Sequence, residues 1–210
     1  MRIAIIDIGM GNLRSVENIV RRHGVEVWRA TNVASLRGAD AFILPGVGAF
    51  SSAINRLHES GLAAALTDQV LGEGRPFLGI CLGMQLICAH SDERGGADGL
   101  GWIDGRWVKL HGGRGCPVPH VGWNEVRVTK ESPLFMGLPP SIHYYFDHSY
   151  RYVGDNTDVI AELDYAGETV VAALHRGNIV AVQFHPERSQ QAGTKLFANF
   201  LTTINQAELV

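Results

Sequence analysis

Cysteine is scarce in this sequence, and its placement excludes two common uses of the residue. The 210 residues include three cysteines, Cys81, Cys88 and Cys116. An odd number argues against a disulfide framework, and the spacings do not match the close pairs that hold a metal ion. Reduced thiols are typical of the cytoplasm, so we expect a cytoplasmic protein without a metal or other cofactor.

An excess of positive charge and long apolar runs are also missing. The formal net charge is −3, which gives no basic surface for nucleic acid. No stretch approaches the roughly 20 apolar residues of a membrane span. Asp7 interrupts the short apolar run at the start, and no small-residue cleavage site follows it, so we expect no signal peptide. With 46% hydrophobic residues, the chain is long enough for one α/β domain with a sizeable core.

The common phosphate-binding loops are absent as well. The turn Gly9-Met10-Gly11 begins like a dinucleotide fingerprint, but Arg14 occupies the position of the third glycine. Glycine also occurs in two other loops that follow predicted strands, at residues 45–48 and 79–83. Such loops are usually just tight turns. In an open parallel sheet, however, ligands bind beyond the carboxyl ends of the strands, so this is where we expect a site.

Strand and helix patterns alternate in the first half of the chain, and strands dominate the second half. Alternating strands and helices predict a parallel sheet that is covered on both faces. We therefore predict one domain, residues 1–210, of α/β class: a three-layer open sheet with a mainly parallel core and an antiparallel extension. The expected strands are 2–8, 25–30, 41–44, 77–80, 102–110, 121–129, 142–153, 159–165, 169–175 and 179–184. Helices are expected around 16–20, at 51–58 and 62–71, from Cys81 to 89, and from Ser189 to about 205, with a hairpin turn at 176–178.

Cys81 lies at the joint between a predicted strand and a predicted helix, with Gly79 and Gly83 on either side. This spacing is typical of a nucleophile elbow, in which a cramped turn exposes the side chain at the top of the sheet. The alternative is a small buried core thiol. We prefer that alternative for Cys88, expected inside along the same helix, and take Cys116 as an incidental loop thiol.

A nucleophile needs a base, and the base needs a group that orients it. The apolar run at 180–184 ends in His185-Pro186-Glu187. Because residues i and i+2 of an extended segment point to one side, about 6 to 7 Å apart at Cα, Glu187 could hold the His185 ring while the ring faces the thiol. We expect Pro186 to keep this segment extended. A plain strand-to-helix turn is the alternative, but the two motifs together favour a catalytic triad of Cys81, His185 and Glu187.

The segments GICLGMQ and QFHPE strongly resemble the class I, triad-type glutamine amidotransferases. The resemblance covers nearly the whole chain and implies their flavodoxin-like fold. In that family, the cysteine attacks the side-chain amide of glutamine, releases ammonia and forms a thioester that water converts to glutamate. Further segments, IAIIDIGMGNLRSV, PGVGAF, PHVGWN, YYFDHSYR and HPERS, resemble the glutaminase subunits of imidazole glycerol phosphate synthases.

That resemblance also implies a partner and a pathway. The expected partner is a cyclase subunit with a (β/α)8 barrel, bound as a heterodimer. It receives the ammonia, stimulates the glutaminase, and makes imidazole glycerol phosphate and an aminoimidazole carboxamide ribonucleotide in histidine biosynthesis. Loops turned towards the cyclase in the family correspond here to Asn12, Pro119, His120, Gly122, Trp123, Asn124 and Arg188. Without the resemblance, Trp123 could equally be a core residue that covers the sheet edge.

The resemblance implies further site residues. The oxyanion hole should use backbone N–H groups of Leu82 and of the loop at Val47 and Gly48. Other family members often have glycine in place of Val47, so a valine puts in doubt whether the hole is preformed. The residues expected to bind glutamine are Gln85, Glu93, His148, Ser149 and Tyr150. From the sequence alone, Glu93 would be a solvated loop charge and Gln85 a helix surface residue.

Two other functions remain open from the sequence. A stand-alone cysteine hydrolase or peptidase would be fully active without a partner. A catalytically dead binding module is disfavoured, because all three residue types of the triad are present.

Overall fold

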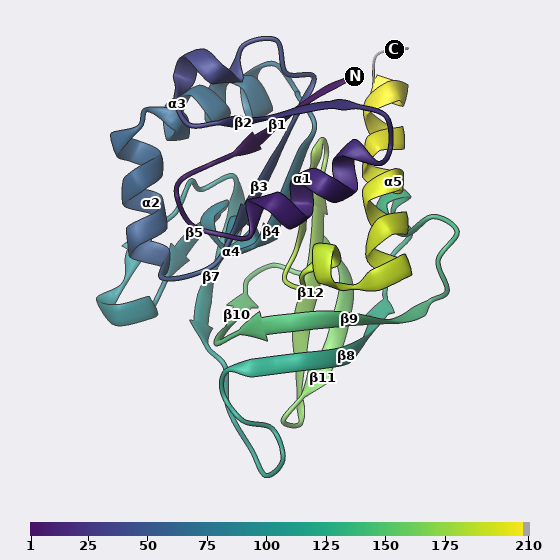
Figure 1. Ribbon diagram of the computed structural model, residues 1–210. Helices are drawn as coiled ribbons and strands as arrows, with labels where there is room; N and C mark the ends of the chain where they lie inside the picture. Colours follow the sequence, from purple (N-terminus) through teal and green to yellow (C-terminus); the bar gives the residue numbers. More distant parts are fainter. Residues whose placement is uncertain (208–210) are drawn as a thin grey trace.

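The computed structural model describes residues 1–207, whose main sheet is shown in Figure 1. Its nine strands follow the order β2-β1-β3-β4-β13-β12-β11-β8-β9. The first five in this order are parallel, and the last four continue the sheet with antiparallel pairing. The parallel strands are β1 (Arg2–Ile6), β2 (Glu26–Ala30), β3 (Ala41–Gly46), β4 (Phe77–Cys81) and β13 (Ile179–Val182). The antiparallel strands are β8 (His120–Val128), β9 (Ser141–His148), β11 (Val159–Tyr165) and β12 (Glu168–Arg176). The predicted mainly parallel core with an antiparallel extension is confirmed.

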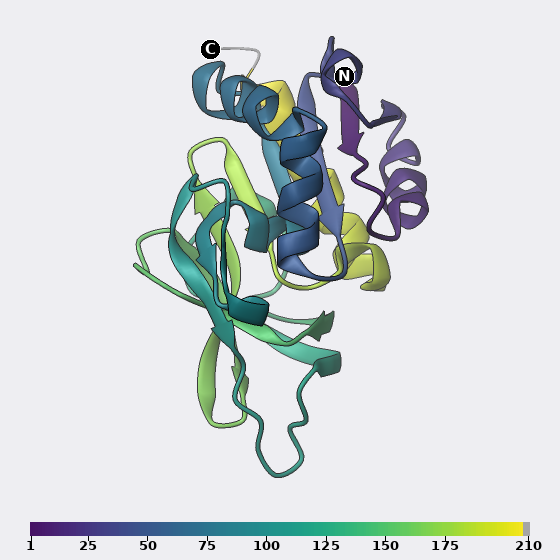
Figure 2. The same cartoon turned by 90° about the vertical axis from the view of Figure 1, so that its left-hand side faces the viewer.

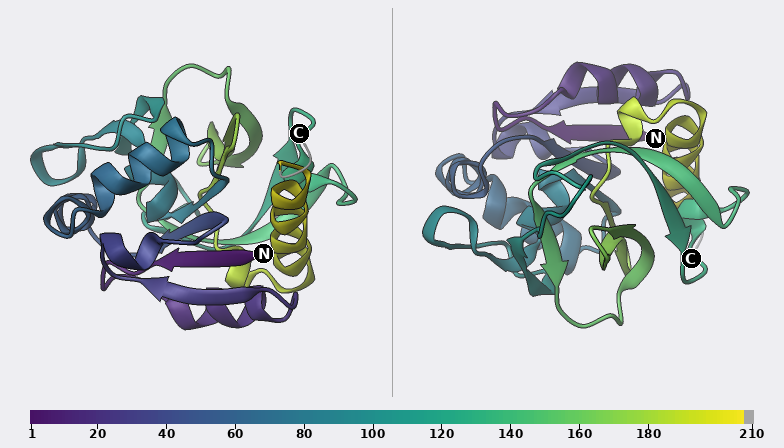
Figure 3. Two further views of the ribbon diagram at one scale, coloured as in Figure 1. Left: turned by 90° about the horizontal axis from the view of Figure 1, so that it is seen from above. Right: turned by 90° about the horizontal axis from the view of Figure 1, so that it is seen from below.

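Helices cover the parallel strands on both faces (Figure 3). Along β1, Ile3 and Ile5 pack in one apolar cluster, with α1 (Leu13–Arg21) and α5 (Gln190–Ala207). The alternate residues Ala4 and Ile6 pack in the other cluster, with α2 (Phe50–Glu59) and α3 (Leu62–Thr67). This alternation follows from strand geometry, in which successive side chains point to opposite faces. Figure 2 views the molecule from the side of α2 and α3, with α5 partly hidden behind the sheet.

A second, smaller sheet has the strand order β10-β7-β5-β6. Its strands are β5 (Cys88–Ser91), β6 (Ala97–Asp98), β7 (Ile103–Lys109) and β10 (Tyr150–Val153). The prediction of one strand at 142–153 is therefore wrong, because the chain leaves the main sheet at Ser149. The Ser149 carbonyl accepts a hydrogen bond from Leu110 N (2.8 Å), next to β7, so the second half of the segment pairs with another sheet. Residue pattern alone cannot show this break, since both halves alternate in the same way.

The helix expected from Cys81 to residue 89 is also shorter than predicted. The helix α4 is confined to Leu82–Leu86, and Cys88 lies in β5. Cys88 is fully buried as expected, but in a strand and not in a helix. The backbone carbonyls of Leu86 and Ile87 accept hydrogen bonds from Leu100 and Trp102. This pairing with a distant segment overrides the helix propensity of the sequence.

Short helical turns connect several elements. They are 3-10 turns at Val33–Leu36, Glu93–Gly95, Pro133–Phe135 and Pro186–Arg188, and a π-helical turn at Asp68–Gly72 that extends α3. The predicted hairpin turn at 176–178 is confirmed, since Arg176 pairs with Ile179 across β12 and β13. Among residues 1–207, none of the helices has the length and apolar character to cross a membrane.

The closest approach of α4 to the sheet yields a test of the fold. A Cβ atom on Gly83 would lie 1.8 Å from the Leu44 carbonyl oxygen. This oxygen belongs to the backbone of β3, so it cannot move away without disturbing the sheet. We expect Gly83→Ala to destabilise the protein by about 3 kcal/mol or more in urea unfolding. The matched control is Gly72→Ala, because nothing lies within 4 Å of a Cβ built there, and it should change stability by at most about 0.5 kcal/mol. Equal stabilities of the two variants would contradict this packing.

Candidate active site

Cys81 ends β4 in a backbone conformation that few non-glycine residues adopt. Its φ is 53° and its ψ is −107°, and α4 begins at the next residue. A Cβ on Gly79 would lie 2.9 Å from the Gly83 carbonyl oxygen, and a Cβ on Gly83 would lie 1.8 Å from the Leu44 carbonyl oxygen, so neither position has room for another residue. Strained backbone of this kind persists only where the surrounding packing enforces it. The strand, turn and helix have the geometry of the predicted elbow.

His185 and Glu187 form a buried pair just beyond β13. His185 Nδ1 lies 2.8 Å from Glu187 Oε1, and the two side chains are only 5% and 4% exposed. The prediction that Pro186 keeps this segment extended is wrong, because Pro186–Arg188 form a 3-10 turn. Proline at the first position of the turn needs no hydrogen bond for its nitrogen, so the chain curls directly after His185. The curl preserves the pairing that the sequence predicts.

The backbone of His185 is held by two hydrogen bonds. Its backbone N–H donates to the Tyr145 carbonyl oxygen (2.8 Å), and its carbonyl accepts from the Ser189 hydroxyl (2.6 Å). Burial alone would lower the pKa of His185, but the charges of Cys81 and Glu187 outweigh it and raise this pKa from 6.5 to about 10. Among the described residues, Nε2 of the ring has no hydrogen-bond partner. This nitrogen is therefore available for proton transfer at the thiol.

One cavity of about 270 Å³ brings together Cys81 and most of the other predicted site residues. Asp147, which the sequence did not single out, joins them, and its carbonyl oxygen lies 3.8 Å from Cys81 Sγ. The lining residues are Val47, Gly48, Cys81, Leu82, Gln85, Glu93, Pro119, Asp147, His148, Ser149 and Tyr150. His185 and Glu187 are not among them.

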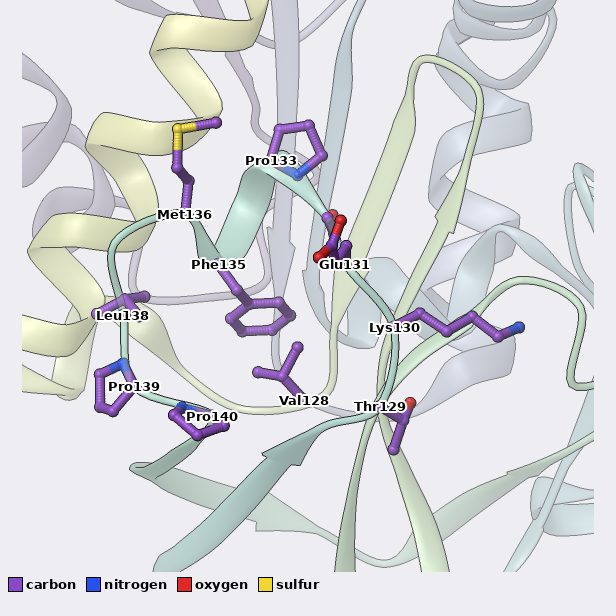
Figure 4. A pocket seen from close by; sticks show the side chains of 11 residues that line it. Val128, Thr129, Lys130, Glu131, Pro133, Phe135, Met136, Leu138, Pro139 and Pro140 are labelled. Carbon is purple, nitrogen blue, oxygen red and sulfur yellow. The ribbon is translucent and has the colours of Figure 1, made fainter.

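A larger groove of about 650 Å³ lies elsewhere, on the loop between β8 and β9 (Figure 4). Apolar and proline side chains line most of it, with Phe135 over Val128 at its centre and Lys130 pointing away. It contains no cysteine or histidine. Size therefore does not identify the site, and the smaller cavity with the nucleophile candidate is the one that can support chemistry.

The loop expected to supply an oxyanion donor packs between two other loops. Gly48 has a φ of 116°, which favours glycine, and Val47 is 44% exposed. A Cβ on Gly11 would lie 3.3 Å from Gly46 Cα, and a Cβ on Gly48 would lie 2.6 Å from Met10 Cε, so the loop after β1 touches the end of β3 and the loop that follows it. Glu93 Oε2 accepts a hydrogen bond from Phe50 N (2.7 Å), the first residue of α2. A carboxylate is favourable at a helix N-terminus, so Glu93 both lines the cavity and anchors the end of this loop.

His148 and His120 belong to a directed chain of hydrogen bonds. His148 Nδ1 lies 2.8 Å from the Tyr150 carbonyl oxygen, which can only accept, so this nitrogen carries the proton. Its Nε2 then accepts from His120 Nδ1 (3.0 Å), and His120 Nε2 in turn accepts from the Asn124 amide (3.5 Å). Both ring nitrogens of His148 are thus engaged by protein groups. Its imidazole shapes the cavity without a free polar atom for a ligand.

The predicted partner-facing residues divide into surface and buried groups. Trp123 is 47% exposed, and its ring meets Tyr145 edge-on at 6.2 Å between centroids. The Arg188 guanidinium lies 3.9 Å above the same Tyr145 ring. Asn12 and Pro119 are exposed and Asn124 is partly buried, whereas the side chain of His120 is buried.

Sequence reasoning missed Tyr145, Asp147 and Gln183. The Gln183 side chain is fully buried and contacts both Gln85 and Cys81. One signal could have identified it: Gln183 precedes His185 by two residues in the apolar run that the sequence predicts as a strand, and a strand would point both side chains to the same side. Gln85 is itself buried, in contrast to the surface position that α-helical patterning suggests.

Comparison with known proteins agrees with this geometry. A family model described as glutamine amidotransferase class-I matches residues 4–204. The imidazole glycerol phosphate synthase subunit HisH of Symbiobacterium thermophilum is 44% identical, over 95% of this chain and 92% of that protein. The protein of the same name from Methanothermobacter thermautotrophicus is 43% identical, over 96% of this chain and 98% of its own length. A crystal structure of a glutamine amidotransferase superimposes with a TM-score of 0.76 at 20% identity, covering 97% of this chain and 98% of that one, which shows a shared fold.

The buried histidine pair predicts a pH dependence of stability. Burial, and for His120 also the neighbouring His148, lowers the pKa of each ring from 6.5 to about 4. Between these values the unfolded chain binds more protons, so the free energy of unfolding should fall as the pH drops from about 6.5 to 4. In urea unfolding over this range, His120→Gln should reduce the slope by up to about 1.4 kcal/mol per pH unit. The control His58→Gln, at an exposed position, should leave it unchanged. Parallel curves for wild type and His120→Gln would contradict the assignment.

Proposed function

The chain belongs to the class I glutamine amidotransferase family, and we propose that it is the glutaminase subunit of an imidazole glycerol phosphate synthase. It hydrolyses glutamine to glutamate and ammonia, and delivers the ammonia to a cyclase subunit with a (β/α)8 barrel in histidine biosynthesis. The names of its relatives support this assignment. Within the chain, the strongest support is the strained elbow at Cys81 together with the buried pair of His185 and Glu187.

The triad carries out two successive acyl transfers. His185 Nε2 takes the thiol proton, and Cys81 Sγ attacks the carboxamide carbon of glutamine. The oxyanion is stabilised by backbone N–H groups of Leu82 and of the loop at Val47 and Gly48. His185 then gives its proton to the departing nitrogen, the C–N bond breaks, and ammonia leaves a glutamyl thioester. Water, deprotonated by His185, attacks the thioester, and the C–S bond breaks to release glutamate.

Glu187 and the burial of the site keep His185 in its role. The Glu187 carboxylate fixes the ring through Nδ1 and stabilises the imidazolium that forms in each step. Burial strengthens this interaction, because little water screens the charges. Cys81 and Glu187 beside the ring raise the pKa of His185 to about 10, so the ring can hold the proton that it takes from the thiol.

The cavity suggests how the polar end of glutamine binds. Glu93 offers the carboxylate for the α-ammonium group, and Gln85 lines the same cavity. The ring of His148 is fully engaged by Tyr150 and His120, so the substrate carboxylate meets the backbone of Ser149 and Tyr150 and not the imidazole. His148 then acts by holding this loop in place.

Cys81 provides the first test of the function. Purified protein should release glutamate from glutamine, and Cys81→Ser should abolish this without lowering the melting temperature.

Activation by the partner is a second expectation. A missing oxyanion donor costs about 10² to 10³ in kcat, and Val47 is poorly suited to an unusual peptide orientation, so the isolated chain should be slow. Adding a barrel-type cyclase with its ligand should raise the rate by a factor of that order. An isolated chain as fast as the liganded complex would favour a stand-alone hydrolase, and glutamate release by Cys81→Ser would overturn the nucleophile.

The partner surface provides an independent test. Trp123 and Arg188 both pack on Tyr145 and form an exposed aromatic and cationic patch of the kind that anchors interfaces. Trp123→Ala should weaken association with the cyclase by about tenfold or more, measured by titration calorimetry, and leave alkylation of Cys81 unchanged. Met136→Ala, which removes another exposed side chain (59%) in the groove of Figure 4, should not change the affinity. Equal losses for both variants would argue against this surface.

A further inference from the structure

Gln183 lies in the core with its polar side chain against the nucleophile. The residue is fully buried, directly after β13. Burying a primary amide is unfavourable unless both its oxygen and its nitrogen find partners. Here each end has one: the oxygen accepts from Gln85 Nε2 (3.0 Å), and Nε2 lies 3.5 Å from Cys81 Sγ. An apolar side chain of the same size could fill this space without that requirement.

The hydrogen bonds of the three side chains run in one direction, from Gln85 through Gln183 to Cys81. Gln85 uses its amide nitrogen as the donor to Gln183, which fixes the Gln183 oxygen as the acceptor. The Gln183 amide nitrogen must then face the sulfur and donate to it. A sulfur atom is a weak acceptor as a thiol and a strong one as a thiolate, because hydrogen bonds to ionised groups are shorter and stronger. The contact therefore favours the ionised form of Cys81.

We propose that Gln183 is a further catalytic residue, which stabilises negative charge on Cys81 Sγ from the side of the core. This inference rests on the glutaminase function proposed above. His185 exchanges the proton, whereas Gln183 donates a hydrogen bond and keeps its own proton throughout. His185 thus moves protons and Gln183 holds the charge, while the Asp147 carbonyl oxygen, 3.8 Å from Sγ, can accept a hydrogen bond only from the protonated thiol.

The contact acts at two points of the reaction. In the resting site it raises the fraction of thiolate that is ready to attack the carboxamide. In the thioester the sulfur carries little charge, so the hydrogen bond is weak. When water attacks and the C–S bond breaks, the electron pair returns to sulfur, and the Gln183 N–H meets the charge as it develops. Gln183 therefore assists the departure of the thiolate, which is the step that regenerates the enzyme.

Gln85 connects this hydrogen bond to the substrate cavity. Its nitrogen is engaged by Gln183, while the residue also lines the cavity beside Glu93. A substrate ammonium group that donates to the Gln85 oxygen polarises its amide and strengthens each bond along the chain to the sulfur. Bound glutamine thereby stabilises the thiolate that attacks it.

The decisive measurement is the pH dependence of Cys81 alkylation by iodoacetamide in the full chain, read at the Cys81 peptide by mass spectrometry. Gln183→Glu keeps the size and the acceptor for Gln85, but places an oxygen instead of an N–H against sulfur. Gln183→Met removes both polar contacts at similar volume. We expect both variants to move the alkylation midpoint up by about one to two pH units. Gln85→Met should shift it in the same direction by less, since Gln183 keeps its contact with the sulfur.

A second readout uses the unaltered protein and does not depend on the variants being stable. The side-chain amide resonance of Gln183, from its ¹⁵N and ¹H shifts, should titrate with the same midpoint as the alkylation, and should not titrate in Cys81→Ser. A Gln183 resonance that ignores ionisation of Cys81, or an unshifted midpoint in folded Gln183→Glu and Gln183→Met, overturns the inference.

These outcomes separate the inference from the proposed function. If alkylation midpoints shift but the wild-type protein, with or without the cyclase, releases no glutamate, Gln183 stabilises a thiolate whose reaction is another one. If glutamate is released and the midpoints do not shift, the chain is a glutaminase in which Gln183 only fills the core. In the active complex, Gln183→Met should also accumulate the thioester, seen as a mass increase at Cys81 during turnover.

Discussion

The turn at Cys81 holds the proposed nucleophile at φ 53° and ψ −107°, and the rest of the site depends on it. Such a conformation is unfavourable for a side chain larger than hydrogen, so it persists only because the packing on both sides allows no relaxation. Gly83 lies against the Leu44 backbone, and Gly79 lies against Gly83. The pairing of Gly46 with Cys81 brings the end of β3 beside the end of β4. The nucleophile and the loop that follows β3, which is expected to offer an oxyanion donor, are therefore positioned by the same backbone contacts.

Burial strengthens the interactions between the side chains that this geometry brings together. In water, an amide, an imidazole and a carboxylate near a thiol would be screened and mobile. Here His185, Glu187 and Gln183 are each almost or fully removed from solvent, and their ring and amide orientations are set by specific hydrogen bonds. A low local dielectric constant makes each of these interactions stronger, and it makes a buried polar group without a partner more costly. The same argument explains the neutral pair of His120 and His148: burial lowers the pKa of both rings, so His148 holds the loop at Tyr150 without adding a positive charge to the cavity.

Sequence patterns predict those parts of the molecule that depend on short-range geometry. The elbow follows from two glycines around a cysteine, and the pairing of His185 with Glu187 follows from a spacing of two residues. Patterns failed where distant segments compete for the same backbone. The segment at Cys88 is a strand because residues 99–102 form hydrogen bonds with it. The segment at 142–153 is divided at Ser149 because its second half pairs with β7. Gln183 was overlooked for another reason: its spacing to His185 indicates the side to which it points, but the side chains that it meets across the core, Gln85 and Cys81, come from a distant part of the sequence.

The surface proposed for the partner and the catalytic base share one residue, Tyr145. Its ring carries Arg188 on one face and meets Trp123 at its edge, whereas its backbone holds the base: the Tyr145 carbonyl accepts from His185 N, and its N–H donates to Ser189 Oγ. The Ser189 hydroxyl in turn donates to the His185 carbonyl. The side chain that meets Trp123 and Arg188 and the backbone that holds His185 and Ser189 therefore belong to one residue. The backbone that supports the proposed base and the ring on which the proposed partner surface packs thus lie on the same short segment of β9.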